Sequence, residues 1–233
     1  MDDAAAQPRR HPLYTRLAIW AAFVSLLGAV NYAERFSGGG GRSKGPSHLS
    51  VYSFSTFAGG TIFYALWLGI VLLICINRFD LLALHRPLNW GRALVLAVFV
   101  VVGVFAWELV VSALPLPESP GKEQGITNVH WEPQHATAFA ANLVLFAMIA
   151  PFVEELTFRG SGQSLLRFLG RWPSIVLVGI AFGLAHGLVE ALLVLVPFGI
   201  ALAWLRDRTT SVVPGMFVHG LFNAAALATI VLR

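Results

Sequence analysis

The stretch Pro151 to Gly160, PFVEELTFRG, decides how the rest of the chain is interpreted. It places Glu154, Glu155 and Arg159 inside a long apolar run. An ionised side chain in the hydrocarbon region of a bilayer costs at least about 2.5 kcal/mol, so these groups need partners or a water-filled cavity. Glu155 and Arg159 can pair across one helical turn as a purely structural contact. That pairing leaves Glu154 unexplained, because Glu154 faces about 100° away from Glu155 around the helix. The stretch therefore predicts a functional site.

The composition around this stretch is that of an integral membrane protein. Of the 233 residues, 57% are hydrophobic and 12% are charged, whereas about 25% are charged in an ordinary soluble domain. The single cysteine, Cys75, excludes an intrachain disulfide and a cysteine metal cluster. The basic residues are spread between apolar segments and form no dense patch, so nucleic acid is not an expected partner.

Apolar runs near the roughly 20 residues that a bilayer requires predict an all-α, polytopic transmembrane helix bundle. We expect about seven spans, with six or eight as alternatives, because only Gly187 to Glu190 separates the fifth from the sixth. The predicted spans are 17–33, 54–77, 93–114, 136–158, 173–189, 190–205 and 212–232. We expect the polar cavity to lie among the C-terminal helices.

The basic residues also predict the orientation of the bundle. Of the 16 Lys and Arg residues, five fall on one side of the predicted spans, namely Arg35, Arg42, Lys44, Lys122 and Arg233. The others fall on the opposite side, at Arg9, Arg10, Arg16, Arg78, Arg86, Arg92, Arg159, Arg167, Arg171, Arg206 and Arg208. The positive-inside rule then places the N-terminus in the cytoplasm.

Two further polar motifs interrupt the C-terminal apolar helices: FGLAH at Phe182 to His186, and HGLFN at His219 to Asn223. Each could simply bond neighbouring helices, as polar residues do in membranes. Glu154 precedes Gly170 by 16 residues and His186 follows it by 16, so two antiparallel helices would place both about 24 Å from the turn. A carboxylate, two imidazoles and an amide are the groups of an acid/base site.

Two other acids have open or minor roles in this interpretation. Glu108, in the third span, either lines the cavity or makes a polar packing contact, and Glu190, beside the short turn, is expected to be solvated. Other protease patterns are missing: the chain contains no HExxH, GxGD or GxSxG motif.

The order EExxxR, FxxxH and HxxxN, each in an apolar segment, closely resembles the CPBP family. This family comprises the type II CAAX prenyl endopeptidases and the bacteriocin-processing (Abi) intramembrane proteases. The resemblance covers residues 136–228. It divides the membrane domain into N-terminal helices and loops at 1–135 and a catalytic helix core at 136–233. It implies a multi-pass enzyme of the bacterial inner (plasma) membrane.

The resemblance also implies roles for the polar residues. Glu154 and His186 would activate a water molecule, and His219 and Asn223 would stabilise the oxyanion formed at a peptide carbonyl. Glu155 and Arg159 would support Glu154. Zinc bound by Glu154, His186 and His219 is an alternative, but we favour a metal-free site without cofactors because HExxH is missing.

The implied activity is that of an intramembrane endopeptidase acting on a membrane-embedded or membrane-anchored protein or peptide, in CAAX-type or related terminal processing. Two alternatives use the same polar cavity without hydrolysis. One is a proton or ion relay transporter, and the other is a bacteriocin-immunity binding protein. The sequence leaves open whether the substrate is prenylated and on which side the cavity opens.

Overall fold

The computed structural model describes residues 11–37, 50–116 and 131–232, which form seven helical rods and contain no β-strand. The first three rods are α1 (His11–Ser37), α2 (Phe54–Ile74) and α3 (Trp90–Ser112). The fourth begins with α5 (Ala136–Val144) and continues through α6 (Ala150–Glu155) and α7 (Gln163–Leu165). The last three are α8 (Arg171–Ala185), α9 (Leu192–Thr209) and α10 (Val213–Leu232).

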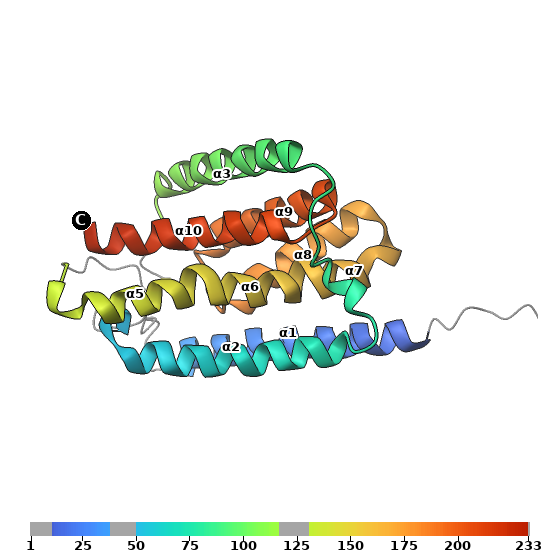
Figure 1. Cartoon of the computed structure of the whole chain (residues 1–233), viewed down its shortest axis with the longest axis horizontal. Coiled ribbons are helices and arrows are strands. Elements are labelled where there is room, and N and C mark those ends of the chain that lie inside the picture. Colours follow the sequence, from blue (N-terminus) through green and yellow to red (C-terminus); the bar gives the residue numbers. More distant parts are fainter. Residues whose placement is uncertain (1–10, 38–49, 117–130, 233) are drawn as a thin grey trace, which may run out of the picture.

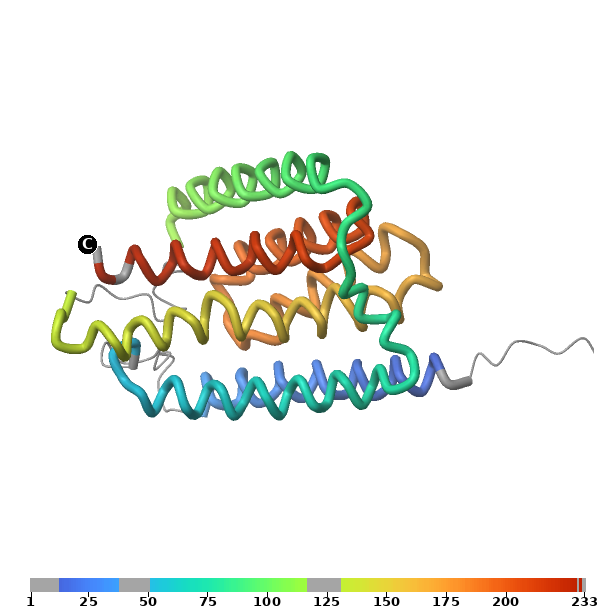
Figure 2. The backbone as a smooth tube through the Cα atoms, viewed as in Figure 1, coloured from blue at the N-terminus to red at the C-terminus, as the bar shows by residue number. Residues whose placement is uncertain are grey.

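The rods run along the long axis of the molecule in alternating directions, so the chain enters at one end and finishes at the other (Figures 1 and 2). In Figure 1, α1 and α2 form one outer layer and α3 lies on the opposite side, against α9 and α10. The fourth rod and α8 to α10 lie between these layers. The buried core draws on all seven rods, including Trp20, Trp67, Val100, Phe158, Phe182, Phe198 and Phe222.

This architecture confirms the predicted polytopic helical bundle. Four helical segments are long and apolar enough to cross a bilayer: Leu13–Ser37, Phe54–Ile74, Trp90–Ser112 and Pro133–Leu169. The predicted fifth span is shorter than expected, because α8 has 15 residues and is about 22 Å long against a hydrocarbon core of about 30 Å. The predicted fourth span is longer, since its rod continues past 158 to Leu169.

The fourth rod is not a regular α-helix, contrary to the geometry assumed for the depth estimate. Wider π-helical turns occupy Leu145–Ile149 and Leu156–Gly162, on either side of α6, and a 3₁₀ turn closes the rod at Leu166–Leu169. Pro151 explains part of this, because it has no N–H to bond the carbonyl of Ala147 one turn earlier. Such π-turns are frequent at functional sites, and here they flank the two glutamates.

The connections from α2 to α3, from the fourth rod to α8 and from α9 to α10 lie at one end of the bundle (Figure 2). Each of these connections has arginines in it or beside it, at Arg78, Arg86, Arg92, Arg167, Arg171, Arg206 and Arg208. The prediction that Arg159 lies with these arginines at the end of a span is wrong. Arg159 is fully buried within the bundle, so it is not a loop residue and does not report orientation. The division of the other described arginines between the two ends of the bundle is unchanged.

Candidate functional site

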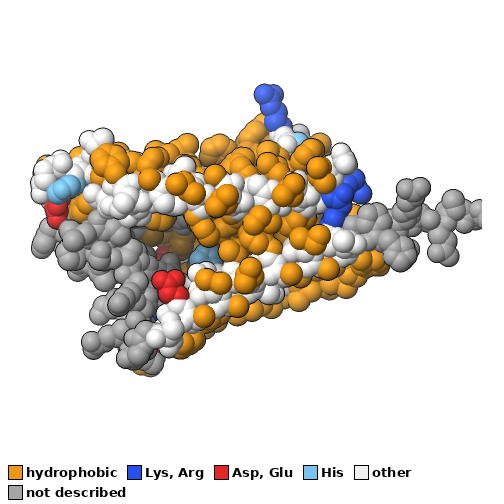
Figure 3. Space-filling model, turned by 90° about the horizontal axis from the view of Figure 1, so that it is seen from below, with side chains coloured by type: hydrophobic (Ala, Val, Ile, Leu, Met, Phe, Trp, Pro, Cys, Tyr) orange, Lys and Arg blue, Asp and Glu red, His pale blue; other side chains and the backbone are white. Residues whose placement is uncertain are grey.

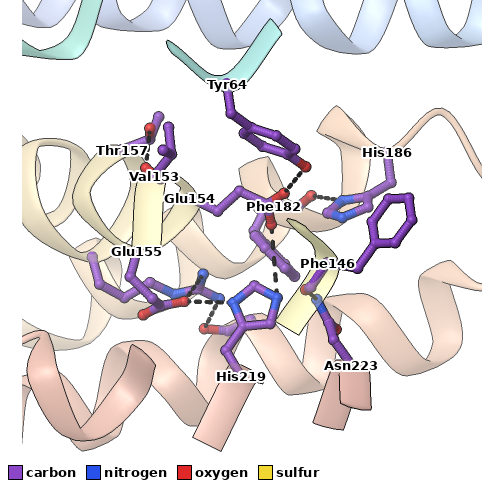
Figure 4. A network of polar contacts seen from close by, with 12 residues as sticks. Tyr64, Phe146, Val153, Glu154, Glu155, Thr157, Phe182, His186, His219 and Asn223 are labelled. Atoms are coloured by element: carbon purple, nitrogen blue, oxygen red, sulfur yellow. Dashed lines mark hydrogen bonds and ion pairs between the residues drawn. The ribbon is translucent and has the colours of Figure 1, made fainter. Parts of the chain in front are cut away.

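Glu154 lies at the end of α6, and its carboxylate contacts two other helices (Figure 4). The hydroxyl of Tyr64 on α2 donates a hydrogen bond of 2.8 Å to Oε1. Nε2 of His219 on α10 lies 3.7 Å from Oε2. The residue as a whole is 6% exposed, so the charge of its carboxylate is balanced largely by protein groups. Glu154 therefore has the separate partners that the sequence predicted for it.

Glu155 and Arg159 form the predicted pair directly behind Glu154. Nη1 of Arg159 donates to Oε1 of Glu155 at 2.8 Å, and both side chains are 0% exposed. Oε1 also lies 3.0 Å from Nδ1 of His219. A second arginine donor, Nη2, reaches the carbonyl of Gly199 on α9 at 3.1 Å. The contacts of this pair thus link α6 to α9 and α10.

The geometry of these contacts depends on a small residue in α10. Gly215 lies one turn before His219, and a Cβ atom at that position would stand 2.8 Å from Oε2 of Glu155. The close approach of the α10 backbone therefore requires glycine. It also places Nδ1 of His219 within hydrogen-bonding distance of Glu155.

His186 stands at the end of α8 with its ring orientation fixed by its own helix. Nδ1 lies 2.7 Å from the carbonyl oxygen of Phe182. A carbonyl can only accept, so Nδ1 carries the hydrogen and Nε2 is the basic nitrogen of the neutral ring. The Phe182 ring lies 4.7 Å from the imidazole, centroid to centroid. His186 is therefore held as a base by contacts within FGLAH.

The predicted proximity of Glu154 and His186 holds only in part. Figure 4 draws both around the same space. The structure nevertheless shows no hydrogen bond or ion pair between them in the described residues. His219 is the imidazole that makes the ion-pair contact with Glu154.

Asn223 lies one turn after His219 on α10 and is half-buried. Its Nδ2 donates to the carbonyl of Phe146 at 2.9 Å, within the π-turn of the fourth rod. The amide has two N–H groups, so one hydrogen remains for another acceptor. Close packing of the helices supports this contact, because a Cβ atom at Gly220 would lie 2.4 Å from the carbonyl oxygen of Ala147.

The site is closed at its base and accessible on one side. Glu155, Arg159 and His219 are buried, whereas Tyr64 and His186 are half-buried. Figure 3 looks onto the layer of α1 and α2 and shows a hollow in this face, with acidic and histidine side chains visible inside. The arrangement allows a polar reaction in a cavity whose walls are apolar.

Sequence reasoning missed the contribution of the N-terminal helices. Tyr64 and Trp67 lie on one face of α2, and Nε1 of Trp67 donates to Oγ1 of Thr157 at 2.8 Å. Nε1 of Trp20, on α1, donates to the Thr157 carbonyl at 2.9 Å. The available signal was a tyrosine in the middle of an apolar span, away from the membrane interface where tyrosine is enriched.

Two other acids proved to lie outside the site. The expectation that Glu190 is solvated is wrong, because its carboxylate lies 3.5 Å from Nη2 of Arg35 and its side chain is 18% exposed. Glu108 is half-buried in α3 and forms no hydrogen bond or ion pair among the described residues. It therefore has no polar contact with the site residues.

The alternative zinc set was tested against the side-chain positions. Among the described residues, no group of three or more His, Cys, Asp or Glu side chains is arranged to hold a metal ion. Nδ1 of both candidate histidines is engaged, in one case by a carboxylate and in the other by a carbonyl, which leaves Nε2 as the available ligand nitrogen of each ring. Zinc bound by Glu154, His186 and His219 stays an alternative prediction from the sequence.

Comparison with known proteins gives one match. Residues 136–225 match the family model described as Rce1-like, type II CAAX prenyl endopeptidase. This segment contains Glu154 and extends through the HGLFN motif, so the match confirms the family resemblance over the region that carries the site. Searches of curated proteins and of solved structures gave no significant match.

Proposed function

With the Rce1-like match over residues 136–225 as the premise, we propose that this protein is a CAAX-type intramembrane endopeptidase. It would hydrolyse a peptide bond of a membrane-associated protein or peptide by means of a water molecule activated at Glu154. The observation that carries the proposal is the contact set of Glu154, whose two oxygens face Tyr64 and His219 over a buried Glu155–Arg159 pair. Such an arrangement orients a carboxylate toward a cavity and supports its charge.

In the proposed reaction, Glu154 removes a proton from water as the oxygen attacks the peptide carbonyl carbon. The basic Nε2 of His186 accepts a hydrogen bond from the other hydrogen of the water and orients it. The proton held by Glu154 then passes to the leaving nitrogen as the C–N bond breaks. A general base of this kind contributes about 10²- to 10⁴-fold to the rate.

The same proposal assigns the developing oxyanion to His219 and Asn223. In this proposal His219 acts as a donor with hydrogen on Nε2, while its Nδ1 faces the Glu155 carboxylate at 3.0 Å. The remaining Asn223 hydrogen provides a second donor. Donors of this type are worth about 2.7–4 kcal/mol in acyl-transfer sites, and Glu155 and Arg159 would keep His219 in place.

Reconstitution distinguishes this function from the two alternatives without turnover. Purified protein in proteoliposomes should convert a membrane-anchored test peptide into two products, detected by mass spectrometry, with no ion gradient imposed. Gradient-dependent ion flux without peptide products would support the relay transporter instead. Peptide binding without products would support an immunity protein.

We further propose that the reaction requires no metal. Exhaustive treatment with phenanthroline should leave the cleavage rate within about twofold of the untreated rate, because a carboxylate base needs no Lewis acid. The measurement is the initial rate of product formation before and after chelation. A loss of cleavage that added zinc restores would contradict this part of the proposal.

Replacing Tyr64 with Phe should lower kcat about 10- to 100-fold, because a hydrogen bond to a charged group is worth about 1.5–3 kcal/mol. KM should remain nearly constant, since the hydroxyl contacts Glu154 rather than the substrate in this proposal. The matched control is Tyr52→Phe, which removes a hydroxyl that contacts the backbone N–H of Glu132. Equal effects of the two variants would argue against a role for Tyr64 in positioning Glu154.

The proposed setting is the bacterial inner membrane, with the N-terminus in the cytoplasm. The support for this orientation is that the connections with arginines in or beside them lie at the end of the bundle where the described chain begins (Figure 2). The substrate is proposed to reach the site from the bilayer, because the hollow in Figure 3 interrupts a helix layer that is otherwise covered by apolar side chains.

A further inference from the structure

A second cavity, of about 510 Å³, lies near the arginine-rich end of the bundle, away from the site residues. One part of its wall is apolar and belongs to the first turns of α1 and to the end of the fourth rod. The other part is polar and includes two arginines, one from the connection between α2 and α3 and one from the last turn of the fourth rod. The lining residues that matter for its chemistry are Leu13, Tyr14, Leu17, Arg78, Arg167 and Phe168.

Both arginines keep donors that no acceptor among the described residues uses. Arg78 donates to Asp80 through Nε and Nη2, each at 2.9 Å, which leaves Nη1. Arg167 donates to Asp207 through Nη1 at 2.5 Å, which leaves Nε and Nη2. Their side chains are 45% and 51% exposed. The unused donors can therefore bind an anion without breaking either ion pair.

The local charge favours an anion as well. Asp207 also pairs with Arg171, at 2.7 Å, so two arginines share one carboxylate and a positive charge remains. Arginine donates two parallel hydrogen bonds to phosphate oxygens, which makes it well suited to this group. An anion at this position would thus find both charge and directed donors.

The apolar wall specifies what the anion is attached to. Leu13 and Leu17 lie on the helix that continues along the surface of the bundle, and Leu13 is exposed. Tyr14 and Phe168 pack edge to face with ring centroids 5.7 Å apart. A molecule with a phosphate at the arginines and a hydrocarbon chain along α1 would satisfy both halves of the cavity.

We propose that this cavity binds one anionic phospholipid, with its phosphate between Arg78 and Arg167 and its acyl chains along the start of α1. The location supports a lipid rather than a soluble anion, because the cavity lies where apolar helix surface meets the arginine-rich end. Anionic lipids attract basic segments next to the membrane at the cytoplasmic leaflet. The inference does not depend on the proposed protease activity.

The test is native mass spectrometry of the full chain in detergent with phosphatidylglycerol or phosphatidylcholine added at equal concentrations. The wild-type protein should retain one phosphatidylglycerol in preference to phosphatidylcholine. Each arginine near an anionic lipid contributes about fivefold to binding, so Arg78→Gln with Arg167→Gln should weaken phosphatidylglycerol binding about 30-fold. Thermal unfolding of the double variant checks that the protein is folded.

The matched control is Arg86→Gln with Arg92→Gln, which removes two exposed arginines from the same end of the bundle but outside the cavity. This pair should leave the lipid preference unchanged. An equal loss in both double variants would show a diffuse charge effect and overturn the proposal. Absence of a preference in the wild type would overturn it as well, and so would full displacement of the lipid by inorganic phosphate. Neither of these two outcomes requires a folded variant.

Discussion

Replacing Glu154 with Gln is expected to lower kcat/KM for peptide cleavage about 10²- to 10⁴-fold, the contribution of a general base. Glutamine has the same shape but cannot take a proton from water. Its carbonyl oxygen can still accept the hydrogen bond from Tyr64, and the substitution removes one negative charge from a largely buried position. The variant should therefore fold normally, with an unfolding temperature close to that of the wild type.

The matched control for this variant is Glu108→Gln. Glu108 is the same residue type, half-buried in another membrane helix, and it makes no polar contact with the site in the described residues. It should retain wild-type cleavage. A folded Glu154→Gln protein that cleaves at the wild-type rate would show that the catalytic base is another group. Inactivity of a folded Glu108→Gln protein would show that Glu108 on α3 contributes to the reaction.

The same pair of variants identifies the substrate. Membrane proteomics of cells that carry either variant, compared with the native enzyme, should show uncleaved termini only for Glu154→Gln. The control variant keeps the fold and is expected to keep cleavage. Termini that accumulate with both variants therefore do not result from loss of cleavage. The proteins that accumulate only with Glu154→Gln are the candidate substrates.

The sequence predicted those features of the site that follow from local spacing and from the cost of charge in a bilayer. Glu155 and Arg159 are four residues apart, and their pairing across one turn needed no tertiary information. The isolation of Glu154 from that pair also followed from helical geometry. The polar motifs FGLAH and HGLFN then indicated the histidines and the amide, the family resemblance supplied their roles, and Figure 4 shows them around the same space.

The features that the sequence did not predict depend on packing between helices. The depth estimate assumed a regular α-helix from Glu154 to Gly170, but the π-turn over Leu156–Gly162 changes both rise and rotation. In the structure, His219 rather than His186 makes the ion-pair contact with Glu154. The role of Tyr64 could not be deduced because nothing in one sequence specifies which face of α2 meets the fourth rod.

Replacing Arg159 with Met is expected to lower the free energy of unfolding by about 3–5 kcal/mol, the usual cost of leaving one member of a buried ion pair without its partner. Arg159 is fully buried and bridges Glu155 to the Gly199 carbonyl, and its guanidinium carbon stands 4.2 Å from the Phe182 ring centroid. The control, Arg171→Met, removes a partly exposed arginine from Asp207, which still pairs with Arg167, and should cost less than about 1 kcal/mol. Reversible unfolding in detergent measures both.

A double variant separates the structural role of this pair from its catalytic role. Adding Glu155→Gln to Arg159→Met removes the unpaired carboxylate, so part of the lost stability should return, because an uncompensated buried charge is what makes breaking a buried pair strongly destabilising. Cleavage should not return, since an amide in place of the Glu155 carboxylate changes the group that faces Nδ1 of His219 at 3.0 Å. Recovery of cleavage together with stability would mean that Glu155 and Arg159 only hold the fold. Stability without cleavage would show that their charges act on the reaction through His219.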